Sequence, residues 1–150
     1  MRYMAMASLA LATAAGAQPP GADPFCNDLR RVVAAAAERP AFGSLPPDVE
    51  QAGISMFGFR NGCGRYEDGN AQVFGCSRQL PPPELRVDIL ADQIALCLPA
   101  AQRLPDTGPE GLFREHVVRF RTPRAVIEAS EGGWRTAGGG RVELLVRPAP

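Results

Sequence analysis

The chain has 150 residues, with 16 basic and 16 acidic side chains and a formal net charge of zero. A chain of this length forms one domain that buries roughly two thirds of the surface its unfolded form exposes. The balanced charge argues against nucleic acid or an anionic membrane as the main partner. Apart from one histidine, every basic residue is Arg, and Ala, Gly and Pro are frequent. This composition indicates a GC-rich bacterial genome and reduces the weight of any single Arg as a functional signal.

Residues 1–17 have the features of a secretory signal peptide. An apolar run from Met4 to Ala15 follows a single basic residue and leads into Ala15-Gly16-Ala17, a small-residue cleavage pattern. We expect cleavage after Ala17, which leaves residues 18–22 as a flexible leader and residues 23–150 as one periplasmic or secreted domain. The alternative is an N-terminal hydrophobic helix of the mature fold, which the following Pro-Pro-Gly run disfavours. No later segment is apolar for long enough to span a bilayer, so no membrane insertion is expected after cleavage.

The first predicted element of the domain is an amphipathic helix. Asp23 suits the N-cap and Pro24 the first helical position. Pro40 is expected to end the helix near Glu38 or Arg39. The apolar residues recur at helical spacing and form one stripe: Phe25, Leu29, Val32, Val33 and Ala36. Two short strands are then compatible with residues 41–45 and 54–60.

A hairpin with a cysteine at each end follows. If Gly69-Asn70 forms a two-residue primed turn, Cys63 faces Cys76 at a non-hydrogen-bonded pair, where the Cα atoms are close enough for a disulfide. A turn at Asp68-Gly69 would instead place Cys63 opposite Phe74. Because four cysteines in an exported protein indicate a disulfide framework, the sequence favours the Cys63–Cys76 pairing.

The second predicted helix explains the remaining two cysteines. It follows Pro81-Pro82-Pro83 and ends after Cys97, before Pro99. Two antiparallel helices on one sheet face would bring Cys97 to Cys26, in the first turn of the first helix, and predict a Cys26–Cys97 disulfide. Zinc is the competing use of these cysteines, but Cys-x-x-Cys is absent and His116 is the only histidine. The apolar face of the helix is formed by Val87, Leu90, Ala91, Ile94 and Leu98, widened by Leu85, Ile89 and Leu96.

Three strands are expected after a polar connector over residues 102–111. They cover residues 115–122, 125–130 and 141–147, and a Pro123-Arg124 loop would pair Arg119 with Glu128 on one face of the sheet. The fold class is therefore α+β, with two helices packed on one face of a mostly antiparallel sheet in the order α-β-β-β-α-β-β-β. Alternation in the last strands predicts that the second sheet face is open to solvent.

Three side chains are candidates for ligand binding, and none is assigned a catalytic role. Trp134 lies in a Gly-rich loop, and aromatic side chains on loops often contact partners. The alternative is a Trp that folds back against the edge of the core. Arg119 and Arg121 share a strand face that is able to hold an anion. The alternative there is a solvated face, partly neutralised by Glu115 and Glu128.

The acidic hairpin tip and the single histidine give weaker signals. Glu67, Asp68 and Asn70 are potential calcium ligands, but the other ligands of an EF-hand loop are missing, so neither a metal nor another cofactor is predicted. His116 would need a nucleophile assembled in space, because no Gly-x-Ser-x-Gly motif is present. The candidates for that nucleophile are Ser44, Ser55, Ser77 and Ser130.

These observations favour a small exported protein that binds another protein or a cell-envelope ligand without catalysis. An inhibitor or an immunity protein is one form of this function. The alternative is a small secreted hydrolase that uses His116. The sequence does not decide the identity of the partner or the oligomeric state.

Overall fold

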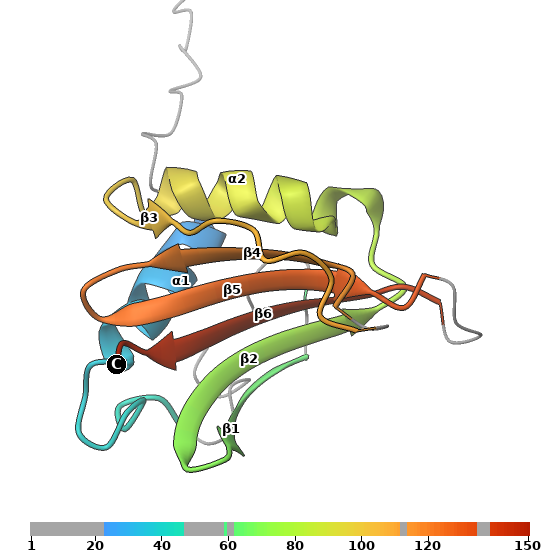
Figure 1. The fold of residues 1–150 in the computed structure, drawn as a ribbon. Helices are drawn as coiled ribbons and strands as arrows, with labels where there is room; N and C mark the ends of the chain where they lie inside the picture. Colours follow the sequence, from blue (N-terminus) through green and yellow to red (C-terminus); the bar gives the residue numbers. More distant parts are fainter. Residues whose placement is uncertain (1–22, 47–58, 60–61, 112–113, 135–138) are drawn as a thin grey trace, which may run out of the picture.

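The computed structural model describes residues 23–46, 59, 62–111, 114–134 and 139–150 (Figure 1). The predicted signal peptide, its leader and the strand predicted over residues 54–60 lie outside these ranges, except for Phe59, which is buried in a turn. The elements are α1 (Pro24–Ala35), β1 (Cys63–Asp68), β2 (Ala71–Gln79), the 3-10 helix η1 (Pro83–Leu85), α2 (Val87–Cys97), β3 (Gln102–Arg103), β4 (His116–Arg121), β5 (Ala125–Gly132) and β6 (Arg141–Pro148).

The strands form one antiparallel sheet in the order β1-β2-β6-β5-β4-β3, so the predicted α+β class is confirmed. Both predicted hairpin registers are also confirmed. Cys63 faces Cys76 across a turn in which Gly69 has a φ of 64°, and Arg119 faces Glu128. The very short β3 was not predicted, because its two residues lie within a polar connector and pair only with the end of β4.

α1 begins as predicted and ends early. The Asp23 side chain accepts a hydrogen bond from the Phe25 N–H at 2.8 Å, which satisfies one of the free donors at the helix start. The regular helix ends at Ala35, and the next turn tightens before Glu38. The strand predicted over residues 41–45 is wrong. This segment forms turns around Phe42, which has a φ of 59° and buries its side chain in the core.

α2 begins later than predicted, because the proline run first forms the 3-10 turn η1. Leu85 lies in η1 and is buried, whereas Ile89 and Leu96 lie on α2 and are exposed. The prediction that Ile89 and Leu96 widen the apolar face is therefore wrong. Their positions point away from the stripe that faces the sheet, which consists of Val87, Leu90, Ala91, Ile94 and Cys97. No helix in the described ranges is long and apolar enough to cross a membrane.

One core lies between the two helices and the inner face of the sheet, defined as the face that carries Phe74, Phe120, Ile127 and Leu144. Cys26 and Cys97 form a disulfide that joins the start of α1 to the end of α2, with 4.9 Å between their Cα atoms. Figure 1 shows α2 running along the strands and α1 running across them. The helices therefore meet at one corner and are not the antiparallel pair that the sequence suggested.

The opposite, outer face is only partly open to solvent, which corrects the sequence-based expectation. Val117, Glu128 and Ser130 lie on this face and are buried. The segment between β3 and β4 passes over this part of the sheet (Figure 1), and Glu110 of that segment binds Arg119. The outer face remains accessible at the other end, over β1, β2 and β6.

Candidate functional site: a groove on the outer face of the sheet

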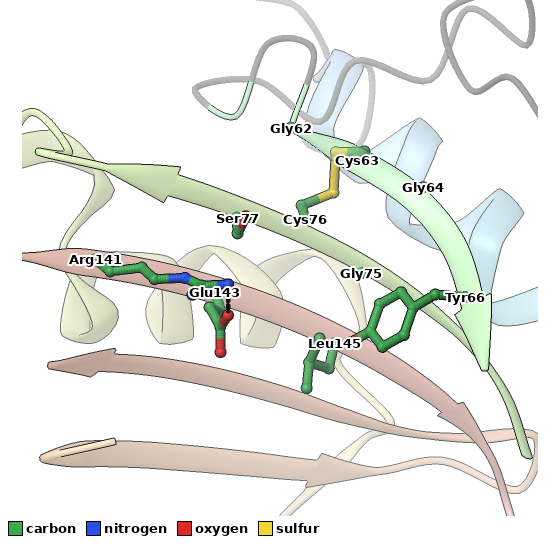
Figure 2. Close-up of a pocket in the computed structure, with 10 residues that line it drawn as sticks. All are labelled: Gly62, Cys63, Gly64, Tyr66, Gly75, Cys76, Ser77, Arg141, Glu143 and Leu145. Atoms are coloured by element: carbon green, nitrogen blue, oxygen red, sulfur yellow. Dashed lines mark ion pairs between the residues drawn. A yellow bond between two sulfur atoms is a disulfide. The ribbon is translucent and has the colours of Figure 1, made fainter. Parts of the chain in front are cut away.

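A groove of about 370 Å³ lies on the outer face where β1, β2 and β6 are neighbours. Figure 2 shows its two ends, with Tyr66 and Leu145 at one and the Arg141–Glu143 ion pair at the other. The hairpin turn and the Cys63–Cys76 disulfide fix β1 against β2 and so fix the shape of the groove. Its lining consists of Gly62, Cys63, Gly64, Tyr66, Gly75, Cys76, Ser77, Arg141, Glu143 and Leu145.

Two facing glycines create the hollow. Gly64 pairs with Gly75 in the β1–β2 register, and Gly75 pairs with Leu145 of β6. A Cβ atom on Gly75 would lie 2.7 Å from the Tyr66 ring and 2.8 Å from a Leu145 methyl group, so the Tyr66 ring already fills that position. A Cβ atom on Gly64 would have no other atom within 4 Å. The groove therefore contains one empty side-chain position, at Gly64, and a partly exposed aromatic ring, that of Tyr66.

The other end of the groove is ionic. Arg141 and Glu143 form an ion pair on β6, and the Arg141 Nε is buried without a hydrogen-bond partner. Ser77 lies between this pair and the glycines (Figure 2). Burial raises the pKa of the Tyr66 hydroxyl, an effect that outweighs the nearby positive charge of Arg147. Tyr66 therefore presents a neutral ring and hydroxyl at neutral pH.

A second hollow, of about 450 Å³, lies beside β1 near the loop that follows α1. The Arg65 side chain points to the inner face, and its Nη1 donates to the Phe42 carbonyl at 2.9 Å. The Arg65 Nε is buried and has no hydrogen-bond partner. The hollow is lined by Pro40, Ala41, Arg65, Tyr66, Glu67 and Gln72.

Arg119 forms ion pairs with two carboxylates of its own chain. Arg119 binds Glu128 at 2.7 Å and Glu110 at 2.6 Å, and Arg114 contacts the same two carboxylates. Burial by itself would lower the pKa of Arg119, but its hydrogen bonds to Glu110 and Glu128 raise that pKa above the ordinary value. Two Arg and two Glu side chains thus form a closed, neutral ring. Arg121, on the same strand face, is exposed and lies outside this ring.

Trp134 is held against the body of the domain, with 38% of its surface exposed. The Arg86 guanidinium lies 4.5 Å from the centre of its ring, and a Cβ atom on Gly140 would overlap the ring. Glu131 in turn binds Arg86 through two hydrogen bonds of 2.8 and 2.6 Å. The Trp134 ring is therefore packed between two neighbours, which resembles the folded-back alternative more than a free contact residue.

His116 is exposed at the start of β4 and faces Glu131 across the strands. In the part of the chain that the structure describes, no hydroxyl group is hydrogen-bonded to its imidazole. Ser130 lies on the opposite sheet face and Ser44 binds Glu38, while Ser77 lines the groove. Ser55 lies outside the described residues. Within the described ranges, no group of three His, Cys, Asp or Glu side chains is arranged to hold a metal ion.

Comparisons with known proteins add no assignment: no family model matches the chain, and neither a curated protein nor a solved structure matches it. The geometry alone therefore identifies the candidate site. Sequence reasoning did not identify the groove, although its signal was present. The expected hairpin register already placed Gly64 opposite Gly75 and next to Tyr66, and two facing glycines in a hairpin leave a gap in one sheet face.

Proposed function

We propose that this chain is a small exported binding protein without catalytic activity, and that the groove over β1, β2 and β6 is its ligand site. Export is inferred from the signal-like residues 1–17 and fits the two disulfides, which form and persist in oxidising compartments. The partner is another protein or a cell-envelope ligand, and inhibition or immunity is one form that such binding takes.

The observation that carries this proposal is the empty side-chain position at Gly64, next to the partly exposed Tyr66 ring. Binding sites commonly combine an apolar, concave surface with a few fixed polar groups. Here the apolar part is Tyr66 and Leu145, and the Arg141–Glu143 pair supplies the polar part. The disulfide holds this surface in one shape, which reduces the ordering cost of binding.

In-cell photo-crosslinking tests the proposal. Tyr66 is replaced by the photoreactive residue p-benzoylphenylalanine, and the same replacement at Leu96 is the matched control. Leu96 is 78% exposed on α2, on the helix side of the sheet. We expect adducts from position 66 and none from position 96, with loss of the adducts when Gly64→Leu fills the groove. If position 66 gives no adduct, or both positions give the same adducts, the groove is not a ligand site.

A further inference from the structure

The hairpin strand β1 lies at one edge of the sheet. Among the residues that the structure describes, β1 pairs only with β2. The Cα atoms of Cys63 and Cys76 are 3.9 Å apart, which identifies a non-hydrogen-bonded pair. The next pair along confirms this phase, because the Ser77 N–H donates to the Gly62 carbonyl at 2.8 Å. By alternation, the N–H and C=O groups of Cys63, Arg65 and Glu67 point away from β2.

Hollows lie on both sides of this edge. The groove is on the outer face beside Gly64 and Tyr66, and the second hollow is beside Arg65 and Glu67, whose side chains point to the inner face. Successive side chains of a strand point to opposite faces of a sheet. A strand added along β1 would therefore place one side chain in the groove and the next in the second hollow.

We propose that the edge of β1 binds an extended peptide segment of a partner protein by strand addition, with an apolar side chain opposite Gly64 and an acidic side chain opposite Arg65. This inference depends on the proposed binding function and names the class of partner. Backbone hydrogen bonds give such complexes their affinity, and the pockets for alternate side chains give their specificity.

The preference for an acidic side chain follows from the surroundings of Arg65. Its guanidinium bonds a neutral carbonyl and retains a buried N–H without a partner. The nearest inner-face carboxylate on the same strand, that of Glu67, is hydrogen-bonded to Gln72 at 3.0 Å. A carboxylate on the incoming strand therefore meets an arginine that no described carboxylate neutralises, and hydrogen bonds to charged groups are stronger than neutral ones.

The preference for an apolar side chain follows from the outer face. Gly64 leaves an unfilled position there, and Tyr66 lines the same groove. An aliphatic or aromatic side chain on the added strand would cover both Gly64 and the exposed part of the Tyr66 ring. Aromatic and β-branched cross-strand neighbours stabilise antiparallel pairs through such contacts.

The test is selection from a random dodecapeptide library displayed on phage, using the disulfide-bonded protein and two variants. Glu67→Pro removes a backbone N–H that points away from β2, and it breaks no described backbone hydrogen bond. Edge strands tolerate proline at such positions. Glu67→Ala is the matched control, because it removes the same carboxylate and keeps the N–H. We expect enriched peptides with an apolar residue next to an acidic one, bound equally by Glu67→Ala and at least tenfold more weakly by Glu67→Pro.

Two further measurements separate the possible outcomes. Methylation of alternate backbone nitrogens in a selected peptide should abolish binding. Because this measurement leaves the protein unchanged, it tests strand addition even if Glu67→Pro does not fold. Arg65→Gln should weaken the binding of acidic peptides by about tenfold or more. Peptides that bind Glu67→Pro and the native protein equally would overturn strand addition and leave the proposed binding function standing. If no peptide is enriched, the inference is also overturned, and the crosslinking result at position 66 then decides whether the groove binds another class of ligand.

Discussion

The carboxylate of Glu131 replaces a local cap for α2, and its removal should weaken the fold by a predictable amount. Arg86 occupies the N-cap position of α2 and makes no capping hydrogen bond with its side chain. The Glu131 carboxylate, brought by β5, accepts from the Val87 N–H at 3.0 Å and from Arg86 at 2.8 and 2.6 Å. It also lies where the helix dipole favours a negative charge.

The magnitude follows from what each partner loses. Glu131→Ala leaves the buried Val87 N–H without an acceptor, which costs about 1–3 kcal/mol. The Arg86 side chain is 44% exposed, so water replaces much of its lost partner and the ion pair itself adds no more than about 1 kcal/mol. We therefore expect Glu131→Ala to lower the free energy of unfolding by about 2–3 kcal/mol. Glu131→Gln keeps an oxygen for Val87 and should cost about 1 kcal/mol.

The effect should depend on pH with a defined sign. Burial by itself raises the pKa of Glu131, but the hydrogen bonds from Arg86 and Val87 and the positive charges of Arg86 and His116 outweigh burial, so that this pKa lies below its ordinary value of 4.5. The unfolded chain therefore binds this proton at a higher pH than the folded chain does. The native protein should therefore exceed Glu131→Gln in stability by the full amount at pH values above 4.5, the ordinary pKa. This difference should shrink as the pH falls through the lower pKa of Glu131 in the folded protein.

Urea denaturation at pH 7 and at pH 3 measures both effects, with the disulfides intact. Trp134 is the only tryptophan, and its ring stacks on Arg86, so its fluorescence reports on this corner directly. Asp68→Ala is the control, because its ion pair with Arg147 is exposed and should contribute less than about 1 kcal/mol. A loss below about 0.5 kcal/mol for Glu131→Ala, or a loss that grows as pH falls, would refute the capping argument.

Three further predictions concern the site and its support. Gly64→Ala should leave the midpoint of thermal unfolding unchanged or raise it. Gly75→Ala should lower the free energy of unfolding by about 1–3 kcal/mol, because its methyl group would displace Tyr66 and Leu145. Equal effects of the two variants in calorimetry would contradict the empty position at Gly64. Replacing Cys63 and Cys76 together with Ala should lower the free energy of unfolding in urea by about 3 kcal/mol, since the disulfide links two positions 13 apart in the sequence. An unchanged midpoint would show that β1 needs no covalent link. Glu128→Ala removes the buried carboxylate from the Arg–Glu ring, while Arg114 and Arg119 keep Glu110 as a partner, and should cost about 1–3 kcal/mol. It should also speed amide exchange in residues 104–111, and unchanged exchange there would mean that the ring does not hold this segment.

Local patterns in the sequence were sufficient for the register of the two hairpins and for the cysteine pairing. The Gly69-Asn70 turn and the period of two along the strands fix which residues face each other, so the pairs Cys63–Cys76 and Arg119–Glu128 could be predicted. Once one cysteine pair is assigned in an even set of four, the other pair follows. The two hairpin registers depend on neighbours within a few residues of a turn, where register leaves few alternatives.

The tertiary structure decided how those elements are used. Arg119 and Trp134 have the sequence context of binding residues, yet both are engaged by residues outside their own strand or turn. Glu110 of the preceding connector binds Arg119, and Arg86 and Gly140 pack against Trp134. The capping of α2 by Glu131 has no local signal, because the carboxylate and the helix start are 44 residues apart. The sequence by itself determined register and pairing, where spacing along the chain sets geometry. Only the packed layers determined which charges neutralise each other, which part of the outer face is covered and where the groove stays open, because those contacts join segments whose separation in sequence carries no information about their separation in space.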